Sequence, residues 1–239
     1  MNQPLDNKSS LSVSTAIVLA GLIIAGSIIY VWGGRDGGFT DTTLGAQPPA
    51  EIPISPVSPE DHIRGAENPG IYVVEFSDTE CPFCKRFHLT MQQIIAEADD
   101  VAWVYRHSPI DALHDRARRE AEAAECAARM GGEGAFWSYL DRIFEETMGN
   151  DSLDPSLLSQ FALELSLDED LFIECLDSGR HAERVEAQLK DAVMVQGGSI
   201  GTPYSIVMSA DGSEKQVIEG AQPIEVVRSI IASVRERLR

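Results

Sequence analysis

The feature that most constrains the fold is a pair of cysteines, two residues apart, at the junction of a strand and a helix. The run 71–76 (IYVVEF) is apolar and rich in β-branched and aromatic residues, which predicts a buried strand. After Cys81-Pro82-Phe83-Cys84, apolar residues at helical spacing predict a helix over 82–98. The run 101–105 (VAWVY) predicts a second strand. The cysteines therefore open the helix of a β-α-β unit.

Helical patterns fill most of the chain after this unit. Helices are predicted at 113–130, at 136–147, from Asp154-Pro155 onward, from a capping box of Ser166 and Glu169 to about Gly179, and at 181–195. Strand character then returns at 204–208 and 216–219, joined by a tight turn at Asp211-Gly212, before a last helix from Pro223 to Leu238. This order predicts an α/β fold in two halves, separated by an all-helical insertion at about 113–197.

The position of the cysteine pair points to thiol–disulfide exchange. Exchange needs one accessible thiolate and a second thiol close by, and the unpaired N–H groups at a helix N-terminus stabilise a thiolate. We therefore assign Cys81, at the exposed end, as the nucleophile and Cys84, one turn further in, as the resolving thiol. Pro82 suits the first helical turn, where a missing N–H costs little.

Two other uses of a C-x-x-C pair are a structural bridge and half of a zinc site. Zinc would need two further ligands, and Cys126 and Cys175 do not form a second C-x-x-C, nor does a histidine accompany them in a zinc-finger pattern. We expect no metal, and no cofactor beyond the redox-active disulfide of Cys81 and Cys84. His88, His107, His114 and His181 are expected to be surface or structural residues, and Trp103, Phe136 and Trp137 to be core residues.

A second signal is Gly201-Thr202-Pro203, which directly precedes a predicted strand. Proline there cannot donate to a sheet, and a tight turn is where cis-proline is found. Taken alone, the motif favours a trans peptide.

Together these motifs give the chain a family resemblance. It resembles the DsbA-like branch of the thioredoxin superfamily, as a membrane-anchored bacterial member, over about 62–238. The matching segments are His62-Ile63-Arg64-Gly65, Val74-Glu75-Phe76-Ser77-Asp78, Cys81-Pro82-Phe83-Cys84, Arg106-His107 to Pro109, His114, Ala124-Glu125-Cys126-Ala127, Phe136-Trp137, Gly201-Thr202-Pro203 and Gly220-Ala221-Gln222-Pro223. The resemblance implies a thioredoxin-like fold whose helical insertion caps the active site. It also implies a cis-Pro203 packed against the cysteine pair, with Thr202 offering backbone hydrogen bonds to a substrate peptide.

One departure from the family concerns Phe83. The best-known oxidases of this family have histidine there, which helps to stabilise the thiolate, and phenylalanine cannot do so. Glu80 places an opposing charge beside Cys81, which Lys85 and Arg86 offset in part. We therefore expect a milder oxidant.

The second cysteine pair, Cys126 and Cys175, lies in two predicted helices of the insertion. Two buried free thiols are one interpretation. A structural disulfide is favoured, because the domain is expected in an oxidising compartment and similar proteins carry cysteines at these positions.

The N-terminal region differs in composition from the rest. Residues 15–32 (TAIVLAGLIIAGSIIYVW) are uncharged, end in aromatic residues, and are close in length to a membrane-spanning helix. We predict a short tail at 1–14, a transmembrane anchor at 15–32 in the lipid bilayer, a Pro/Gly-rich linker at 33–59 and the folded domain at 60–239. A cleaved signal peptide is the alternative. The net charge of −19 argues against a nucleic-acid partner.

These observations predict a single-pass protein of the cell membrane whose catalytic domain is extracytoplasmic. It would oxidise cysteine pairs in exported proteins, with a quinone-linked membrane oxidase as reoxidant. The same motif would also serve a reductase or isomerase, because the reduction potential decides the direction. A non-catalytic tethered binding module and a metallochaperone are further alternatives.

Overall fold

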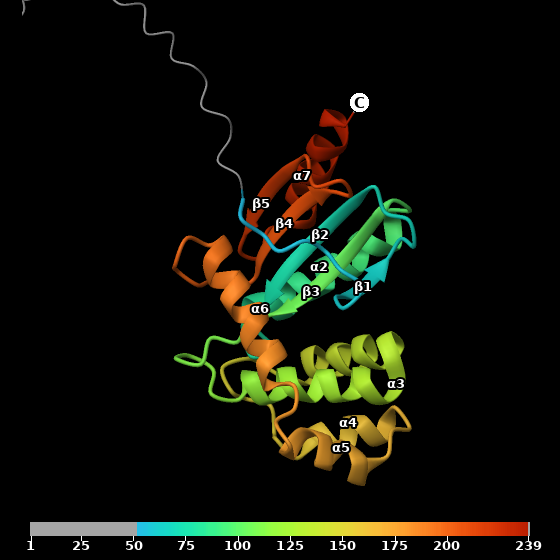
Figure 1. Ribbon diagram of the computed structural model, residues 1–239, viewed down its shortest axis with the longest axis vertical. Coiled ribbons are helices and arrows are strands. Elements are labelled where there is room, and N and C mark those ends of the chain that lie inside the picture. The colour runs from blue at the N-terminus through green and yellow to red at the C-terminus, as the bar shows by residue number, and fades with distance from the viewer. Residues whose placement is uncertain (1–51, 239) are drawn as a thin grey trace, which may run out of the picture. The chain divides into compact units, whose positions relative to one another are not determined.

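The computed structural model describes residues 52–238, which form a five-stranded sheet with helices on both faces (Figure 1). The strand order is β1-β3-β2-β4-β5. The strands are β1 (His62–Gly65), β2 (Ile71–Ser77), β3 (Val101–His107), β4 (Tyr204–Ser209) and β5 (Lys215–Glu219). β2 and β3 are parallel, and the other neighbours are antiparallel. The predicted thioredoxin-like α/β fold is confirmed.

β2 and β3 could be predicted from the sequence because both lie in the centre of the sheet. Both are buried along almost their whole length, so their sequences are nearly continuously apolar. β1 was not predicted as a strand, because four residues with a charged Arg64 among them show no usable periodicity. It is an edge strand whose pairing with β3 requires the tertiary structure.

Two cores cover the two faces of the sheet. The larger lies under α2 (Pro82–Glu97), α3 (Ala117–Glu146) and α7 (Ile224–Arg237), and it includes the predicted core residues Trp103, Phe136 and Trp137. The smaller lies under α6 (Ala182–Val195).

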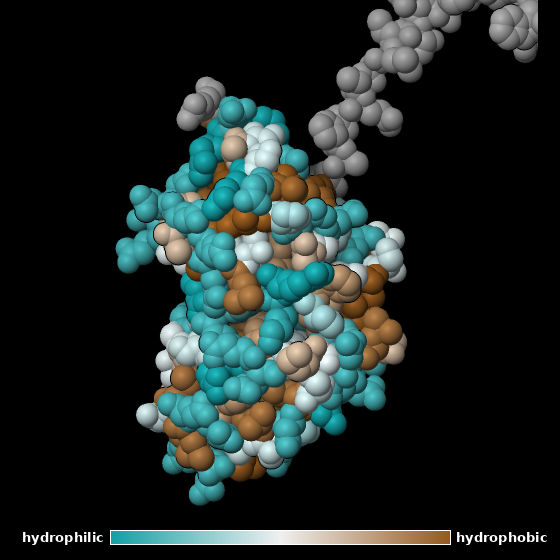
Figure 2. Space-filling model, turned by 180° about the vertical axis from the view of Figure 1, so that it is seen from behind, coloured by the Kyte–Doolittle hydropathy of each residue, from teal (hydrophilic) through white to brown (hydrophobic). Residues whose placement is uncertain are grey.

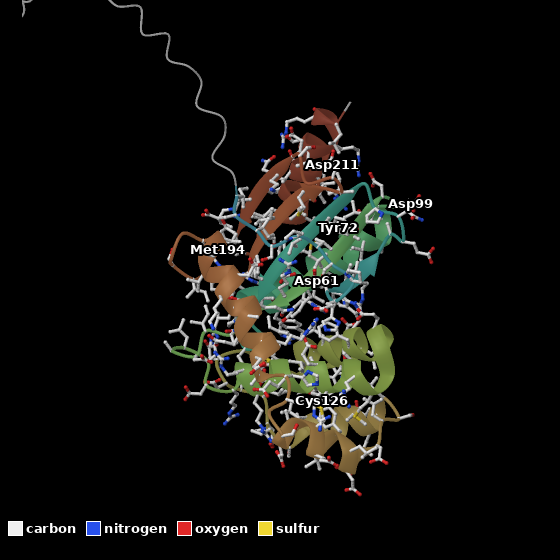
Figure 3. All side chains as sticks on the ribbon, in the orientation of Figure 1. Asp61, Tyr72, Asp99, Cys126, Met194 and Asp211 are labelled. Atoms are coloured by element: carbon white, nitrogen blue, oxygen red, sulfur yellow. A yellow bond between two sulfur atoms is a disulfide. The ribbon has the colours of Figure 1, made fainter. Side chains whose placement is uncertain are left out.

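The segment just before the sheet also packs on the smaller core. Ile52, Ile54 and Val57, at the end of the predicted linker, contact its apolar residues. Arg106 holds this segment, because its guanidinium donates to the carbonyls of Ser55 and Pro56 and to the carboxylate of Asp61, which is labelled in Figure 3. Residues 52–61 are thus part of the folded domain.

The helical insertion contains α3, α4 (Leu157–Glu164), α5 (Glu169–Asp177) and α6, and α3, α4 and α5 form a bundle beside one end of the sheet (Figure 1). Its helices extend from Ala117 to Val195. The two helices predicted at 113–130 and 136–147 are both present as the two parts of α3, which the non-helical backbone of Gly132 (φ 73°, ψ −165°) divides, but two other details were wrong. Ser156 rather than Asp154 precedes α4. Asp168, which accepts from the Leu171 N–H, caps α5, whereas Ser166 has a positive φ of 60° and caps nothing.

The predicted hairpin joins β4 and β5. Its loop runs from residue 210 to residue 214 because the Asp211 carboxylate accepts hydrogen bonds from the hydroxyl of Ser209 and the backbone N–H of Ser213. Gly212 has φ +74°, which explains the glycine there.

The predicted tail at 1–14, anchor at 15–32 and first part of the linker lie outside the described residues. Within residues 52–238, no helix combines the length and apolarity needed to cross a bilayer. Figure 2 shows a largely hydrophilic face on which apolar patches are interspersed.

Candidate active site

The cysteine pair lies where β2 ends and α2 begins, as predicted. Cys81 is the N-cap residue of α2, Pro82 occupies its first turn, and no acidic side chain lies in that turn. Cys84 is fully buried, and Cys81 is only 6% exposed, which is less than the sequence suggested. Both are free thiols in this structure.

The two thiols have opposite acid–base properties. A hydrogen bond from Cys84 is the largest cause that lowers the pKa of Cys81 to about 6, and the backbone N–H groups of Phe83 and Cys84 add to it against the effect of burial. Burial, and then the charge on Cys81, raises the pKa of Cys84 well above its ordinary value. The lowered pKa favours the thiolate form of Cys81, whereas the raised pKa keeps Cys84 protonated.

The peptide bond between Thr202 and Pro203 is cis, and this loop covers Cys81. Cys81 Sγ lies 3.4 Å from the carbonyl oxygen of Thr202. That contact explains the low exposure of the sulfur. A groove of about 620 Å³ continues from the cis-proline loop, between the end of α6 and the start of β4. Its lining includes Gln196, Ser199, Thr202, Pro203, Tyr204 and Glu219.

Glu75 also belongs to the candidate site, although its role was not predicted from the sequence. It is fully buried on β2, and its Oε2 accepts a hydrogen bond of 2.9 Å from Trp103 Nε1. Burial raises the pKa of Glu75 to about 7, and its charge in turn raises the pKa of Cys84. A lone glutamate within the apolar run IYVVEF was the available signal, since an acidic residue inside a buried strand is costly without a purpose.

Asp78 is a second such residue, and it holds the backbone around the cysteines. Its N–H donates to Cys84 Sγ at 3.4 Å, and its carbonyl accepts from the Cys81 N–H at 3.2 Å. Its buried carboxylate accepts from the N–H groups of Glu80 and Ile110 and lies 2.9 Å from His114 Nδ1. Burial alone would lower the pKa of His114, but the hydrogen bond to Asp78 and its charge raise it on balance. His114 is thus a buried structural residue beside the site.

Glu80 does not face Cys81 as its neighbouring position suggested. Its buried carboxylate accepts hydrogen bonds from the Thr147 hydroxyl and from the N–H groups of Ser152 and Leu153. Its carbonyl accepts from the Asn150 N–H at 2.7 Å. Glu80 therefore fixes the loop 147–153 of the insertion against the start of α2, so the insertion borders the active site as the family resemblance implied.

The cations expected to offset Glu80 are also engaged elsewhere. Lys85 Nζ donates to the carbonyls of Glu145 and Thr147 at the end of α3. The guanidinium of Arg86 lies 4.8 Å from the centre of the Phe83 ring, and Phe83 is 54% exposed. Phe83 therefore presents an apolar surface next to the cysteine pair.

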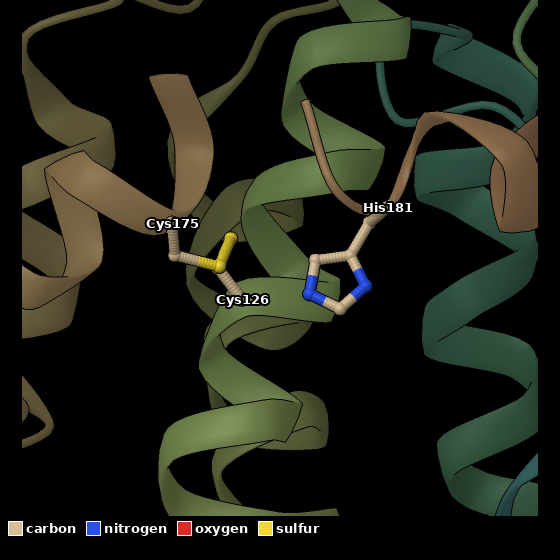
Figure 4. Close-up of side chains that lie close together, drawn as sticks. All are labelled: Cys126, Cys175 and His181. Carbon is tan, nitrogen blue, oxygen red and sulfur yellow. A yellow bond between two sulfur atoms is a disulfide. The ribbon is translucent and has the colours of Figure 1, made fainter. Parts of the chain in front are cut away.

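The structure joins Cys126 of α3 to Cys175 of α5 in the favoured disulfide (Figure 4). Figure 4 also shows His181 beside this disulfide, a proximity that sequence spacing did not reveal. Because both sulfurs are bonded to each other, His181 is the one free donor of this group, which does not suit a metal ion.

Comparisons with known proteins agree with this geometry. The family model described as Thioredoxin matches residues 57–224. DsbA2 of Pseudomonas aeruginosa is 25% identical, with a TM-score of 0.63 over 77% of this chain and 97% of that one. DsbA of Chlamydia trachomatis is 18% identical, with a TM-score of 0.61 over 80% of this chain and 98% of that one, which supports the fold alone.

Curated relatives add an unexpected class of protein. A sodium/proton antiporter of Salinispora tropica, NhaA 3, is 38% identical over 64% of this chain, and NhaA of Herminiimonas arsenicoxydans is 33% identical over 80%. This chain spans 22% and 29% of their respective lengths. The shared segment is thus a minor part of each longer relative.

Proposed function

Since this chain belongs to the thioredoxin family and is DsbA-like in fold, we propose that it is a protein disulfide oxidoreductase that oxidises cysteine pairs in exported proteins. The observation that carries the proposal is the acid–base asymmetry of the pair, a Cys81 thiolate above a buried Cys84 thiol. A stable thiolate favours the reduced form of the enzyme. Its disulfide is then a better oxidant than one between ordinary thiols.

The proposed reaction has two exchange steps. A substrate thiolate attacks Cys81 Sγ of the Cys81–Cys84 disulfide, and Cys84 leaves as a thiolate that takes a proton from Glu75. A second substrate thiolate then attacks the substrate sulfur of the mixed disulfide and releases Cys81 as a thiolate. Two electrons pass from the substrate, which gains a disulfide, to the enzyme pair.

The groove beside the cis-proline loop is the proposed place for the substrate chain. It begins at Thr202 and Pro203, next to Cys81, so a peptide seated there would bring its cysteine to the nucleophile. The Thr202 backbone is the proposed hydrogen-bonding partner, and exposed Phe83 offers an apolar contact.

Reduction potential separates the oxidase from the reductase and isomerase alternatives. A Cys81 pKa of about 6 lies between those of thioredoxin, about 7, and DsbA, about 3.5. We expect a potential between about −270 and −120 mV, measured against glutathione buffers. A value near or below that of thioredoxin would favour the reductase instead.

Active-site variants test the chemistry itself. Cys81→Ser should abolish thiol oxidation and insulin reduction, whereas Cys84→Ser should trap mixed disulfides with substrates. Activity that survives in Cys81→Ser would contradict the proposal and favour a tethered binding module. Tight binding of a soft metal ion by the reduced pair, without exchange activity, would favour the metallochaperone.

We further propose that residues 15–32 anchor the protein in the cell membrane with the catalytic domain outside the cytoplasm, where a quinone-linked membrane oxidase reoxidises it. An oxidising compartment suits the proposed chemistry and the Cys126–Cys175 disulfide. Membrane fractionation and protease treatment of spheroplasts test this. Digestion of the domain without lysis is expected, and full protection would indicate the opposite topology.

A second candidate function follows from the antiporter relatives. A segment like this chain forms part of proteins named as sodium/proton antiporters, which suggests that its exchange chemistry acts on a membrane transporter. Mixed disulfides trapped by Cys84→Ser test both candidates. Soluble exported proteins support general oxidation, and a transporter as the dominant product supports the second.

A further inference from the structure

The buried Cys84 thiol needs a route by which its proton can reach solvent. Each cycle of the proposed exchange moves a proton between Cys84 and solvent, yet the Cys84 side chain is fully buried. Glu75 exchanges that proton in the proposed mechanism, but it is fully buried as well. A route must therefore connect Glu75 with the surface.

A row of polar residues crosses the sheet at the level of Glu75. In the strand register, Glu75 is paired with Ser205 of β4 on one side and with Tyr105 of β3 on the other, and Tyr105 is paired with His62 of β1. Residues paired in this way point to the same face of a sheet. All four are buried, and the face is the one that α2 and α3 cover.

Beyond Tyr105, the row continues to the edge of the domain. The rings of Tyr105 and His107 are 5.3 Å apart, centre to centre. The carboxylate of Glu125 lies between two histidines, 3.4 Å from His107 Nε2 and 3.2 Å from His62 Nε2, and its Oε1 also accepts a hydrogen bond of 2.6 Å from Arg184 Nε. His62 Nδ1 lies 2.8 Å from Glu133, whose side chain is 55% exposed. Alternating acidic and imidazole groups thus extend from the core to water.

The part of the row nearest to Glu75 contains polar atoms without protein partners. Within the described residues, Glu75 Oε1, Ser77 Oγ, Tyr105 Oη and Ser205 Oγ are all buried and make no hydrogen bond to another protein group. An unpaired buried polar atom costs about 1–3 kcal/mol, so one carboxyl oxygen and three hydroxyl groups without partners need an explanation. Unpaired buried polar groups are commonly satisfied by ordered water, which can pass a proton between its neighbours.

We infer that Tyr105, His107, Glu125, His62 and Glu133 form a proton path that connects Glu75, and through it Cys84, with solvent. The inference rests on the proposed exchange function. When Cys84 leaves the enzyme disulfide, Glu75 gives it a proton and regains one through the path; when the disulfide is re-formed, the proton travels outward. The Tyr105 hydroxyl can donate one proton while it accepts another, so it carries the transfer without a net charge.

Step-resolved kinetics of the reduced enzyme with oxidised glutathione test the path. In the first step the Cys81 thiolate attacks the glutathione disulfide and needs no proton from Cys84. In the second step Cys84 loses its proton and displaces glutathione from Cys81. Acid quenching and mass spectrometry follow the Cys81–glutathione intermediate and so separate the two rates.

Tyr105→Phe removes one hydroxyl and keeps the ring. We expect an unchanged first step and a second step slowed by at least about tenfold, with an altered solvent deuterium isotope effect on that step. Tyr139→Phe is the matched control, since Tyr139 is equally buried but its hydroxyl donates to the Leu158 carbonyl inside the insertion. It should leave both steps unchanged. A wild-type second step in Tyr105→Phe, or equal slowing of both steps, would overturn the path.

Glu133→Gln tests the solvent end of the proton path. Because it changes only an exposed side chain, it still tests the path if Tyr105→Phe does not fold. We expect Glu133→Gln to slow the second step selectively. Glu164→Gln is the control, because Glu164 is also exposed but pairs with an arginine outside the path, and it should not slow that step. A second step at the wild-type rate in Glu133→Gln would count against the path. Failure of the wild-type enzyme to form the glutathione intermediate would instead contradict the exchange function itself.

Discussion

Gly149 lies against Pro82 so closely that a Cβ atom on it would be 2.6 Å from Pro82 Cγ and 3.1 Å from the carbonyl oxygen of Glu80. Gly149 also has φ +86°, a conformation that favours glycine. The end of α3 and the first turn of the active-site helix therefore fit together through one residue without a side chain.

Gly149→Ala should accordingly disturb both stability and exchange. The clash should lower the free energy of unfolding by about 1–3 kcal/mol, and the displacement of Pro82 should slow the reaction of Cys81. Gly179→Ala is the control, because Gly179 also has positive φ, +61°, but nothing lies within 4 Å of its Cβ position. Urea unfolding and alkylation rates measure the difference, and equal effects of the two variants would count against the contact.

Glu80→Ala should destabilise the protein by about 2–4 kcal/mol, because three donors of loop 147–153 lose a buried acceptor. Glu97→Ala provides the comparison. It removes an exposed carboxylate paired with Arg228 and should cost less than about 1 kcal/mol. Denaturant unfolding of both variants checks the prediction, which fails if the two costs are alike.

Glu75→Gln should change how the stability of the reduced protein depends on pH. Burial raises the pKa of Glu75 from 4.5 to about 7, so the folded state binds more protons than the unfolded state between these values. Wild-type stability should therefore lose the contribution of Glu75 as pH rises from about 4.5 to about 7. The variant lacks this loss, so its stability relative to wild type should rise across that interval and level off above it. Urea unfolding of both proteins at pH values on both sides of this interval measures the difference. A stability difference between variant and wild type that stays the same would contradict the prediction.

Replacement of both Cys126 and Cys175 by alanine should reduce stability without abolishing exchange. The disulfide closes a loop with a sequence separation of 49, which corresponds to about 4 kcal/mol on the chain-entropy model. Thermal unfolding and an insulin-reduction assay measure the two effects separately. Loss of exchange in a variant that still folds would give this disulfide a role beyond stability.

Strong local patterns made the main elements predictable. The apolar runs of β2 and β3, the helical spacing after Cys84 and the turn before Pro203 depend only on nearby residues, and the structure contains each of them. Weaker local signals misled: Ser166 has the spacing of a capping box, but Asp168 makes the cap because the chain turns at Ser166 with positive φ. β1 escaped prediction because its pairing with β3 depends on the tertiary structure.

By itself, the sequence determined the chemistry and its place: two cysteines at the start of a helix, a proline loop for their partner, and a helical insertion between the halves of the fold. Tertiary structure alone decided what surrounds them. It buried both Glu75 and Cys84, turned Glu80 away from Cys81 toward loop 147–153, and brought His181 to the Cys126–Cys175 disulfide. The physical reason is that strand and helix periodicity arise from neighbours along the chain. Burial and hydrogen bonding, in contrast, depend on residues from distant segments that only folding brings together.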